Sequence, residues 1–142
     1  MRTRGLALGL LALVLGAGCE ERRDLASGDL FDYKGFDEQG RAVIEGTLLF
    51  EVVGDHLAGH WHLSSLVPES QVGPQIGEGS FDGSFVSDAE RSTVVLNLNP
   101  RQVDYNVFLN GTLEGRDFEG RWSLTTLVGE THFGRFEAER HD

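Results

Sequence analysis

The sequence predicts an all-β domain, an eight-stranded antiparallel up-and-down meander that closes into a small barrel. Three observations predict it. From residue 30 onward, short runs of β-type residues alternate with turn residues, and no stretch shows the 3.6-residue period of a helix. Each run alternates apolar and polar side chains, which indicates one buried and one solvated face. An internal repeat also divides the eight strands into two four-stranded units.

The expected strands follow one another through short connections. They cover residues 29–37, 42–53, 56–66, 78–87, 92–99, 103–114, 117–126 and 131–140. Gly54-Asp55 and Gly115-Arg116 are typical tight turns, and only the connection from Pro68 to Gly77 is long. Consecutive strands joined in this way form an antiparallel meander.

The repeat is clearest around the two tryptophans. Residues 57–67 align with residues 118–128 at a constant offset of 61 positions, and both segments read Gly-x-Trp-x-Leu, at Trp61 and Trp122. Residues 46–48 match 111–113 upstream, and residues 79–81 match 134–136 downstream. Two copies of one four-stranded unit explain these matches better than chance.

Strand parity predicts which side chains point inward. No charged residue is placed inward, and the inward set contains eight aromatic residues that form a candidate apolar interior: Phe50, Trp61, Phe81, Phe85, Tyr105, Phe118, Trp122 and Phe136. Eight amphipathic strands without a covering helix either close or form a sandwich. Inward glycines at positions 46, 59, 83, 111, 120 and 134 permit the coiling that closure needs, which favours the barrel.

The domain resembles the calycin barrels, the lipocalin-like and avidin-like proteins. The resemblance rests on strand number, meander order and the Gly-x-Trp elements at Gly59 and Gly120. The resemblance covers residues 29–141 and is architectural: it implies an eight-stranded antiparallel meander closed into a barrel. It implies no individual binding residue, because lipocalins carry Gly-x-Trp on the first strand and this chain carries it on the third and seventh.

The first residues differ in kind from the rest. Arg2 and Arg4 precede about fourteen residues without a polar or charged side chain, a run too short to span a bilayer, which needs about twenty. This run ends in Gly16-Ala17-Gly18 before Cys19, the single cysteine of the chain. The segment resembles the lipobox of bacterial lipoproteins. That resemblance implies a signal peptide at 1–18, diacylglycerol and palmitate on Cys19, a tether over 19–29, and a barrel domain at 30–142.

The charge of the chain bears on its partners. Residues 1–18 hold two of the twelve basic residues and none of the 23 acidic ones, so removing them lowers the formal net charge from −11 to −13. Such a domain repels nucleic acid and an anionic bilayer, so the lipid must supply the membrane affinity. We therefore expect a membrane-anchored protein of the cell envelope, on its periplasmic or outer surface.

Three functions stay open on the sequence alone. The first is a non-enzymatic binding protein for an apolar small molecule or a protein partner; the second is a structural or interaction protein with a solid core. The third is an enzyme with a site at the barrel mouth, formed by the loop from Pro68 to Gly77. No Gly-x-Ser-x-Gly nucleophile motif occurs and no cofactor is expected. His56, His60 and His62 are weak metal candidates, because parity places them on the solvated face.

Overall fold

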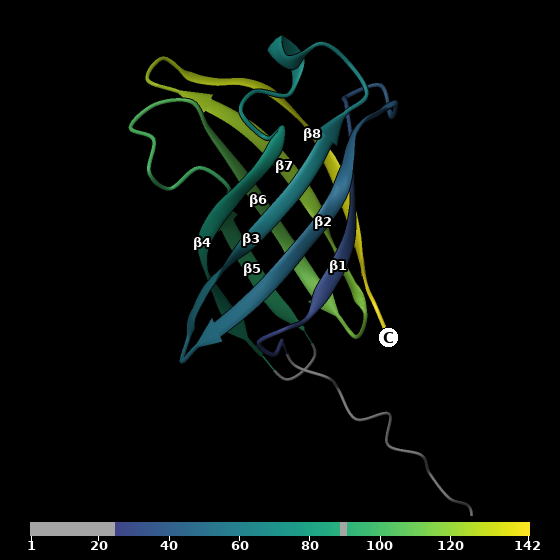
Figure 1. The fold of residues 1–142 in the computed structure, drawn as a ribbon, viewed down its shortest axis with the longest axis vertical. Helices are drawn as coiled ribbons and strands as arrows, with labels where there is room; N and C mark the ends of the chain where they lie inside the picture. Colours follow the sequence, from purple (N-terminus) through teal and green to yellow (C-terminus); the bar gives the residue numbers. More distant parts are fainter. Residues whose placement is uncertain (1–24, 89–90) are drawn as a thin grey trace, which may run out of the picture.

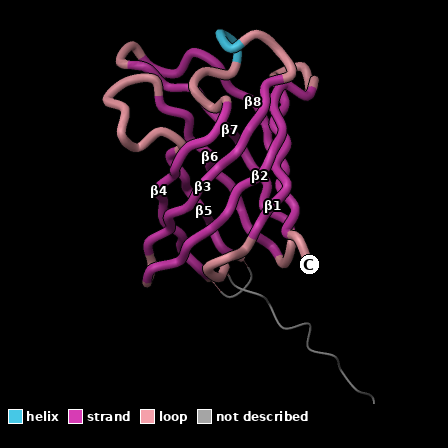
Figure 2. Tube along the Cα trace, in the orientation of Figure 1, coloured by secondary structure: helices cyan, strands magenta, loops and turns pink. Residues whose placement is uncertain are grey.

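The computed structural model describes residues 25–88 and 91–142, and these form a closed eight-stranded barrel (Figure 1). Each strand pairs antiparallel with the next, and β8 returns to β1, which confirms the predicted meander. The strands are β1 (Leu30–Phe36), β2 (Ala42–Val53), β3 (His56–Ser65), β4 (Gly77–Ser87), β5 (Ser92–Asn97), β6 (Asn106–Glu114), β7 (Asp117–Thr126) and β8 (Gly129–Arg140). The described part adds one short 3-10 helix, η1 (Glu69–Gln71), in the β3–β4 connection (Figure 2).

The barrel has two unlike ends. At one end, here called the base, lie the short turns at Gly54-Asp55 and Gly115-Arg116 together with both ends of the described chain (Figure 1). At the other end, here called the rim, lie the β1–β2, β3–β4, β5–β6 and β7–β8 connections. No helix of the described residues is long and apolar enough to cross a membrane.

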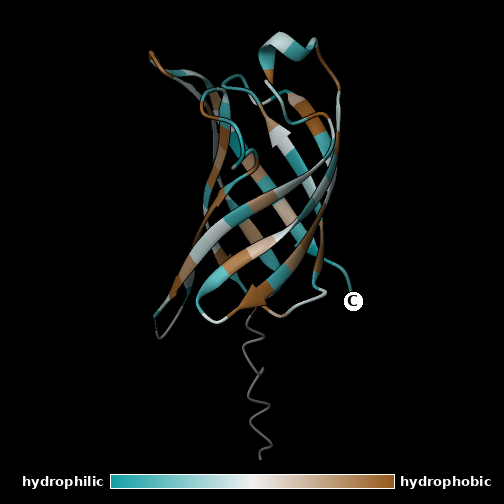
Figure 3. Cartoon of the chain, turned by 60° about the vertical axis from the view of Figure 1, so that its left-hand side comes forward, coloured by the Kyte–Doolittle hydropathy of each residue, from teal (hydrophilic) through white to brown (hydrophobic). Residues whose placement is uncertain are grey.

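Aromatic rings contact one another in the interior of the barrel. Hydrophobic and hydrophilic residues alternate along the strands (Figure 3), and the inward rings lie in edge contact with one another. Ring centroids are 5.2 Å apart for Phe31 and Phe50, 5.0 Å for Phe50 and Phe81, and 4.8 Å for Phe118 and Phe136. All five rings are buried. Offset and edge contacts of this kind add to the stabilisation from buried area.

The connection between β5 and β6 is longer than the sequence predicts, because two asparagine side chains end the ladder early. The backbone N–H of Asn99 donates to Asn97 Oδ1 at 2.9 Å, and the backbone N–H of Val107 donates to Asn99 Oδ1 at 3.1 Å. Pro100 follows and supplies no N–H to a further ladder. The strand expected at 92–99 therefore ends earlier, as β5, and the strand expected at 103–114 begins later, as β6. Residues 98–105 between them form a rim loop.

The base corrects one expectation, because a charged side chain does point inward there. Arg140 shares the inward face of β8 with Phe136 and Ala138, and its side chain is 1% exposed. Its Nη1 lies 3.6 Å from Asp29 Oδ2, and its guanidinium lies 5.2 Å from the Phe31 ring centroid. Burying a charge is costly unless it is paired. The prediction of an uncharged inner face overlooked this final residue of β8.

Residues 25–29, within the segment expected as a tether, lie against the base. The Gly28 N–H donates to the Phe50 carbonyl at 2.8 Å, and Phe50 N–H donates to the Asp29 carbonyl at 2.9 Å. Leu25 packs against the hydrophobic core. The ordered domain thus includes five residues before β1.

The pairing registers support one flanking match of the repeat and correct the other. Trp61 is opposite Gly79 and Gly59 opposite Phe81; in the second half Trp122 is opposite Gly134 and Gly120 opposite Phe136. Residues 79–81 and 134–136 are therefore equivalent, as predicted. Gly46 is opposite Leu63, whereas Gly111 is opposite Gly120. The upstream match of 46–48 with 111–113 is thus wrong in register.

Candidate functional site

The aromatic residues predicted to line the interior form one buried cluster, with two exceptions. Phe50, Trp61, Phe81, Phe118, Trp122 and Phe136 are all buried. Phe85 is half-buried and packs against the cluster. Tyr105 instead lies in the rim loop with 49% of its surface exposed and a φ of 67°. Its predicted inward position is wrong, because β6 begins only at Asn106.

The two tryptophans occupy equivalent positions near the rim. Each indole passes beneath a glycine on the next strand and hydrogen-bonds to a carbonyl beyond it. Trp61 Nε1 donates to the Leu98 carbonyl, and Trp122 Nε1 donates to the Phe36 carbonyl, both at 2.8 Å. A Cβ at Gly79 would collide with the Trp61 ring, and a Cβ at Gly134 would collide with the Phe36 carbonyl. These glycines are therefore required by the close approach.

Above these tryptophans the barrel wall opens into two clefts. The β4–β5 ladder ends towards the rim at Asp82 and Asn97, and the β8–β1 ladder ends at Phe136 and Gly35. A cleft of about 440 Å³ lies beyond the first opening, with Trp61 in its lining. Its other lining residues are Glu69, Pro74, Ile76, Glu78, Gly79, Ser80 and 98–102. A smaller cleft of about 310 Å³ lies beyond the second opening, between residues 37–41 and His132, with Trp122 in its lining.

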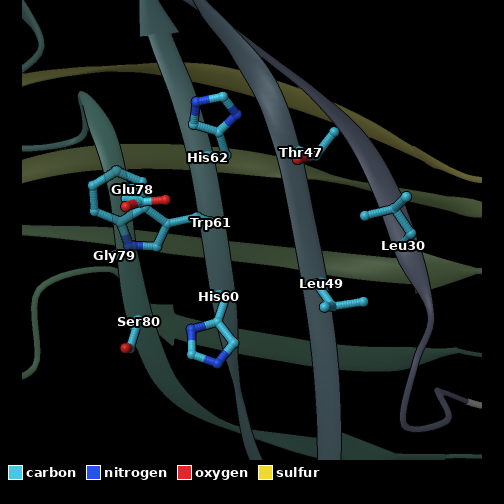
Figure 4. Close-up of a pocket in the computed structure, with 9 residues that line it drawn as sticks. All are labelled: Leu30, Thr47, Leu49, His60, Trp61, His62, Glu78, Gly79 and Ser80. Carbon is cyan, nitrogen blue, oxygen red and sulfur yellow. The ribbon is translucent and has the colours of Figure 1, made fainter.

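The histidine candidates lie on the outer wall, as parity predicts. His60 and His62 line a shallow cleft on β3 together with Glu78 of β4, and their rings project away from one another (Figure 4). His56 lies further toward the base, where its Nε2 is 3.9 Å from Asp82 Oδ1. Among the residues that the structure describes, no group of three histidine, cysteine or acidic side chains is arranged to hold a metal ion.

The β3–β4 connection, expected to supply an enzyme site at the barrel mouth, covers the rim end of the barrel. Val72 and Gln75 are fully buried, and Gln75 Nε2 donates to the Val72 carbonyl at 2.8 Å. Asn99 Nδ2 donates to the Pro74 carbonyl at 2.8 Å, which ties this connection to the loop 98–105. The segment therefore packs one apolar and one polar side chain, Val72 and Gln75, into the barrel end.

Ion pairs at the rim shift several pKa values. The Arg121 guanidinium binds both carboxylate oxygens of Glu130 and lowers the pKa of that carboxyl, while Glu130 raises the pKa of Arg121. At Asp37, partial desolvation is outweighed by hydrogen bonds from the Arg41 backbone and side chain, so the pKa is lowered. Inside the barrel, burial raises the pKa of Tyr33 far above its ordinary value. The lowered pKa values favour the ionised forms of Asp37 and Glu130, whereas a carboxyl that acts as a general acid needs a raised pKa.

A corner of the rim carries uncovered apolar side chains. Val103 and Tyr105 lie on the loop 98–105, and Leu127 and Val128 form the turn between β7 and β8. Asp104 joins the two connections, because its Oδ1 accepts from the N–H of Leu127 and of Tyr105, both at 2.8 Å. Sequence reasoning missed this corner. The available signal was Leu-Val between two strands, where a tight turn favours glycine or asparagine.

The lipid-attachment candidate, Cys19, lies outside the described residues. Comparison with known proteins adds no assignment: no family model, curated protein or solved structure matches this chain.

Proposed function

We propose that this chain is a non-enzymatic lipoprotein of the cell envelope, in which a filled β-barrel acts as a scaffold for contacts with another protein. The filled interior is the observation that carries the proposal. Eight-stranded barrels either are filled by their own side chains or hold one small ligand. Phe31, Phe50 and Phe118 contact one another inside the barrel with centroid distances of 5.2 to 6.4 Å, so their rings fill interior space that a ligand would need.

Both ends of the barrel support the same proposal. The Arg140–Asp29 pair and residues 25–29 cover the base, and Val72 and Gln75 cover the rim. A guest would have to displace a buried ion pair or a packed loop to enter. The second of the three functions left open by the sequence, an interaction protein with a solid core, is therefore favoured over an apolar-ligand carrier.

The lipid anchor rests on Cys19 and the preceding signal-like segment. Cys19→Ser should abolish incorporation of labelled palmitate and leave either unprocessed precursor or a domain free of the membrane. The control is Ser27→Ala, which lies in the same N-terminal region and should leave labelling unchanged. Unaltered membrane partition and mature mass in Cys19→Ser would contradict the anchor.

The filled interior is tested with benzene, a probe that enters dry apolar cavities of sufficient size. Purified residues 20–142 should show no saturable binding of benzene by calorimetry. Phe118→Ala serves as the positive control, because removing a fully buried ring opens a cavity in the same cluster. Stoichiometric binding to the unmodified domain would overturn the proposal and return the carrier function to first place.

A further inference from the structure

The exposed apolar side chains at the rim form a patch. Relative exposure is 91% for Val103, 79% for Leu127 and 92% for Val128, and Tyr105 is half exposed. Single exposed apolar residues are ordinary on protein surfaces, but contiguous ones indicate contact sites. Here Asp104 fixes the two connections side by side, so these four residues lie on neighbouring segments of the rim. We call them the distal corner.

The backbone at the distal corner is held in an uncommon conformation. Tyr105 is the single non-glycine residue with positive φ in the described part of the chain. A left-handed conformation is costly for a bulky side chain, and such strain persists where surrounding contacts impose it. The hydrogen bond from Tyr105 N–H to Asp104 Oδ1 helps to impose it here. The chain thus holds a tyrosine outward at a conformational cost.

Other aromatic side chains on the outer wall near the rim are shielded, which sets the distal corner apart. The Arg121 guanidinium lies 4.3 Å from the ring centroid of Phe133, and that of Arg135 lies 3.9 Å from the centroid of Phe36. Both rings are half-buried in this way. At Leu127 and Val128, by contrast, nearly the whole side chain faces solvent.

Resting on the proposed function, we infer that the distal corner is a docking surface for a protein partner that receives Leu127 and Val128 in an apolar pocket. Position argues against the anchoring bilayer as the occupant. The described chain begins at the base, at the end opposite the β7–β8 turn (Figure 1). Leu25 lies six positions after Cys19, a distance of about 20 Å at full extension, so the lipid holds the base near the bilayer and the corner away from it.

Charge argues against a second copy of the chain. Two copies would bring together domains that each carry a formal charge of −11 or below. The same charge attracts a partner of basic character, whose association rate should fall as salt is added. A projecting turn that enters a pocket concentrates binding energy in few residues, as contact hot spots do.

The test uses the full lipidated chain in its native cells, with the photoreactive residue benzoylphenylalanine replacing Leu127. Illumination should give one polypeptide adduct. The same residue at Val86, an exposed valine on β4 toward the base, serves as the control and should give none. With the photoreactive residue at Val103, the further change Val128→Asp should remove the adduct, and Val86→Asp should leave it. Neither aspartate is expected to alter the melting temperature, because both positions are exposed.

The crosslinked polypeptide is then identified by mass, purified and titrated against residues 20–142. Val128→Asp should weaken its affinity at least tenfold, and Val86→Asp should leave it unchanged. An adduct of twice the chain's mass, an adduct to phospholipid alone, or no adduct at Leu127 would each overturn the inference. Failure here is distinct from failure of the proposed function, because benzene binding reports on the interior whether or not the corner makes an adduct.

Discussion

The two halves of the barrel share one construction and differ in what they build upon it. In β1–β4 the Trp61 indole passes beneath Gly79 and binds the Leu98 carbonyl; in β5–β8 the Trp122 indole passes beneath Gly134 and binds the Phe36 carbonyl. The wall opens above both indoles, and a cleft follows in each case. The opening is therefore a property of the repeated unit.

The two clefts differ in volume, and the connections at the rim account for this difference. Beside Trp61, the long β3–β4 segment and the loop 98–105 surround a cleft of about 440 Å³. Beside Trp122, the cleft is smaller, and the β1–β2 turn that borders it is folded tightly by Asp37, which accepts from the N–H groups of Gln39 and Arg41. The β7–β8 turn, equivalent to the beginning of the long segment, is reduced to Leu127-Val128 and exposed. The same repeated unit thus carries different rim connections at its two openings.

The largest expected effect comes from removing the indoles. Trp122→Ala should lower the free energy of unfolding by about 3–5 kcal/mol, the usual range for a large buried aromatic. Trp61→Ala should fall at the lower end of that range, because Trp61 borders the open cleft and is 5% exposed against 1% for Trp122. Urea unfolding of residues 20–142 measures both. A loss below about 0.5 kcal/mol in either variant would contradict the shared construction.

A second comparison adds one methyl group at each matched glycine. At Gly134 the new Cβ meets backbone, the Phe36 carbonyl, whereas at Gly79 it meets the Trp61 side chain, which can shift. Overpacking costs about 1–3 kcal/mol where neighbours adjust. Gly79→Ala should fall in that range, and Gly134→Ala should exceed it. Equal losses of stability in thermal and urea unfolding would show that the backbone at the β8–β1 opening shifts as easily as the Trp61 side chain.

The third prediction concerns Asn99, which shapes the first-half opening. Its side chain accepts from Val107 N–H and donates to the Pro74 carbonyl, and the residue is buried. Asn99→Ala should destabilise the domain by about 1–3 kcal/mol, because both backbone groups lose their partner. Hydrogen exchange should quicken in the β3–β4 connection and not at the base. Exchange that quickens uniformly would mean that Asn99 does not act locally.

Strand alternation was sufficient to predict the barrel, because its period places one face of every strand in the core. The tryptophans, most inward aromatics and the downstream glycine match also followed from parity and spacing. Tyr105 did not, since two asparagine side chains replace the ladder before it and no alternation reveals that. The Asn97-Leu98-Asn99-Pro100 sequence contains turn-forming residues, and these favour an end of the strand near Asn97 over its continuation to residue 99.

The remaining differences between prediction and structure arise from contacts between residues far apart in the sequence. Strand parity places Arg140 on the inward face of β8, but Asp29, the carboxylate that pairs with it there, lies 111 positions earlier in the chain. The distal corner forms because Asp104 binds the backbone of Leu127, across 23 positions. Neither pairing has a local sequence pattern. Residues whose role depends on such a partner are therefore the ones that sequence alone cannot assign.

The smallest expected effect is a pH dependence that arises from the β1–β2 turn, at the rim beside Trp122. The folded-state pKa of Asp37 is lowered by Arg41, so this carboxyl contributes stability above its ordinary pKa, and the contribution is lost as pH falls through the folded value. Asp37→Asn should therefore lower the melting temperature slightly at pH 7 and leave it nearly unchanged at pH 2. Glu69→Gln, an exposed acid of the first-half rim, is the matched control and should alter neither value. Added salt should shrink the Asp37 effect, because an exposed pair is screened. A difference between Asp37→Asn and the unmodified domain that persists undiminished at pH 2 would show that the turn depends on the shape of the side chain and not on its charge.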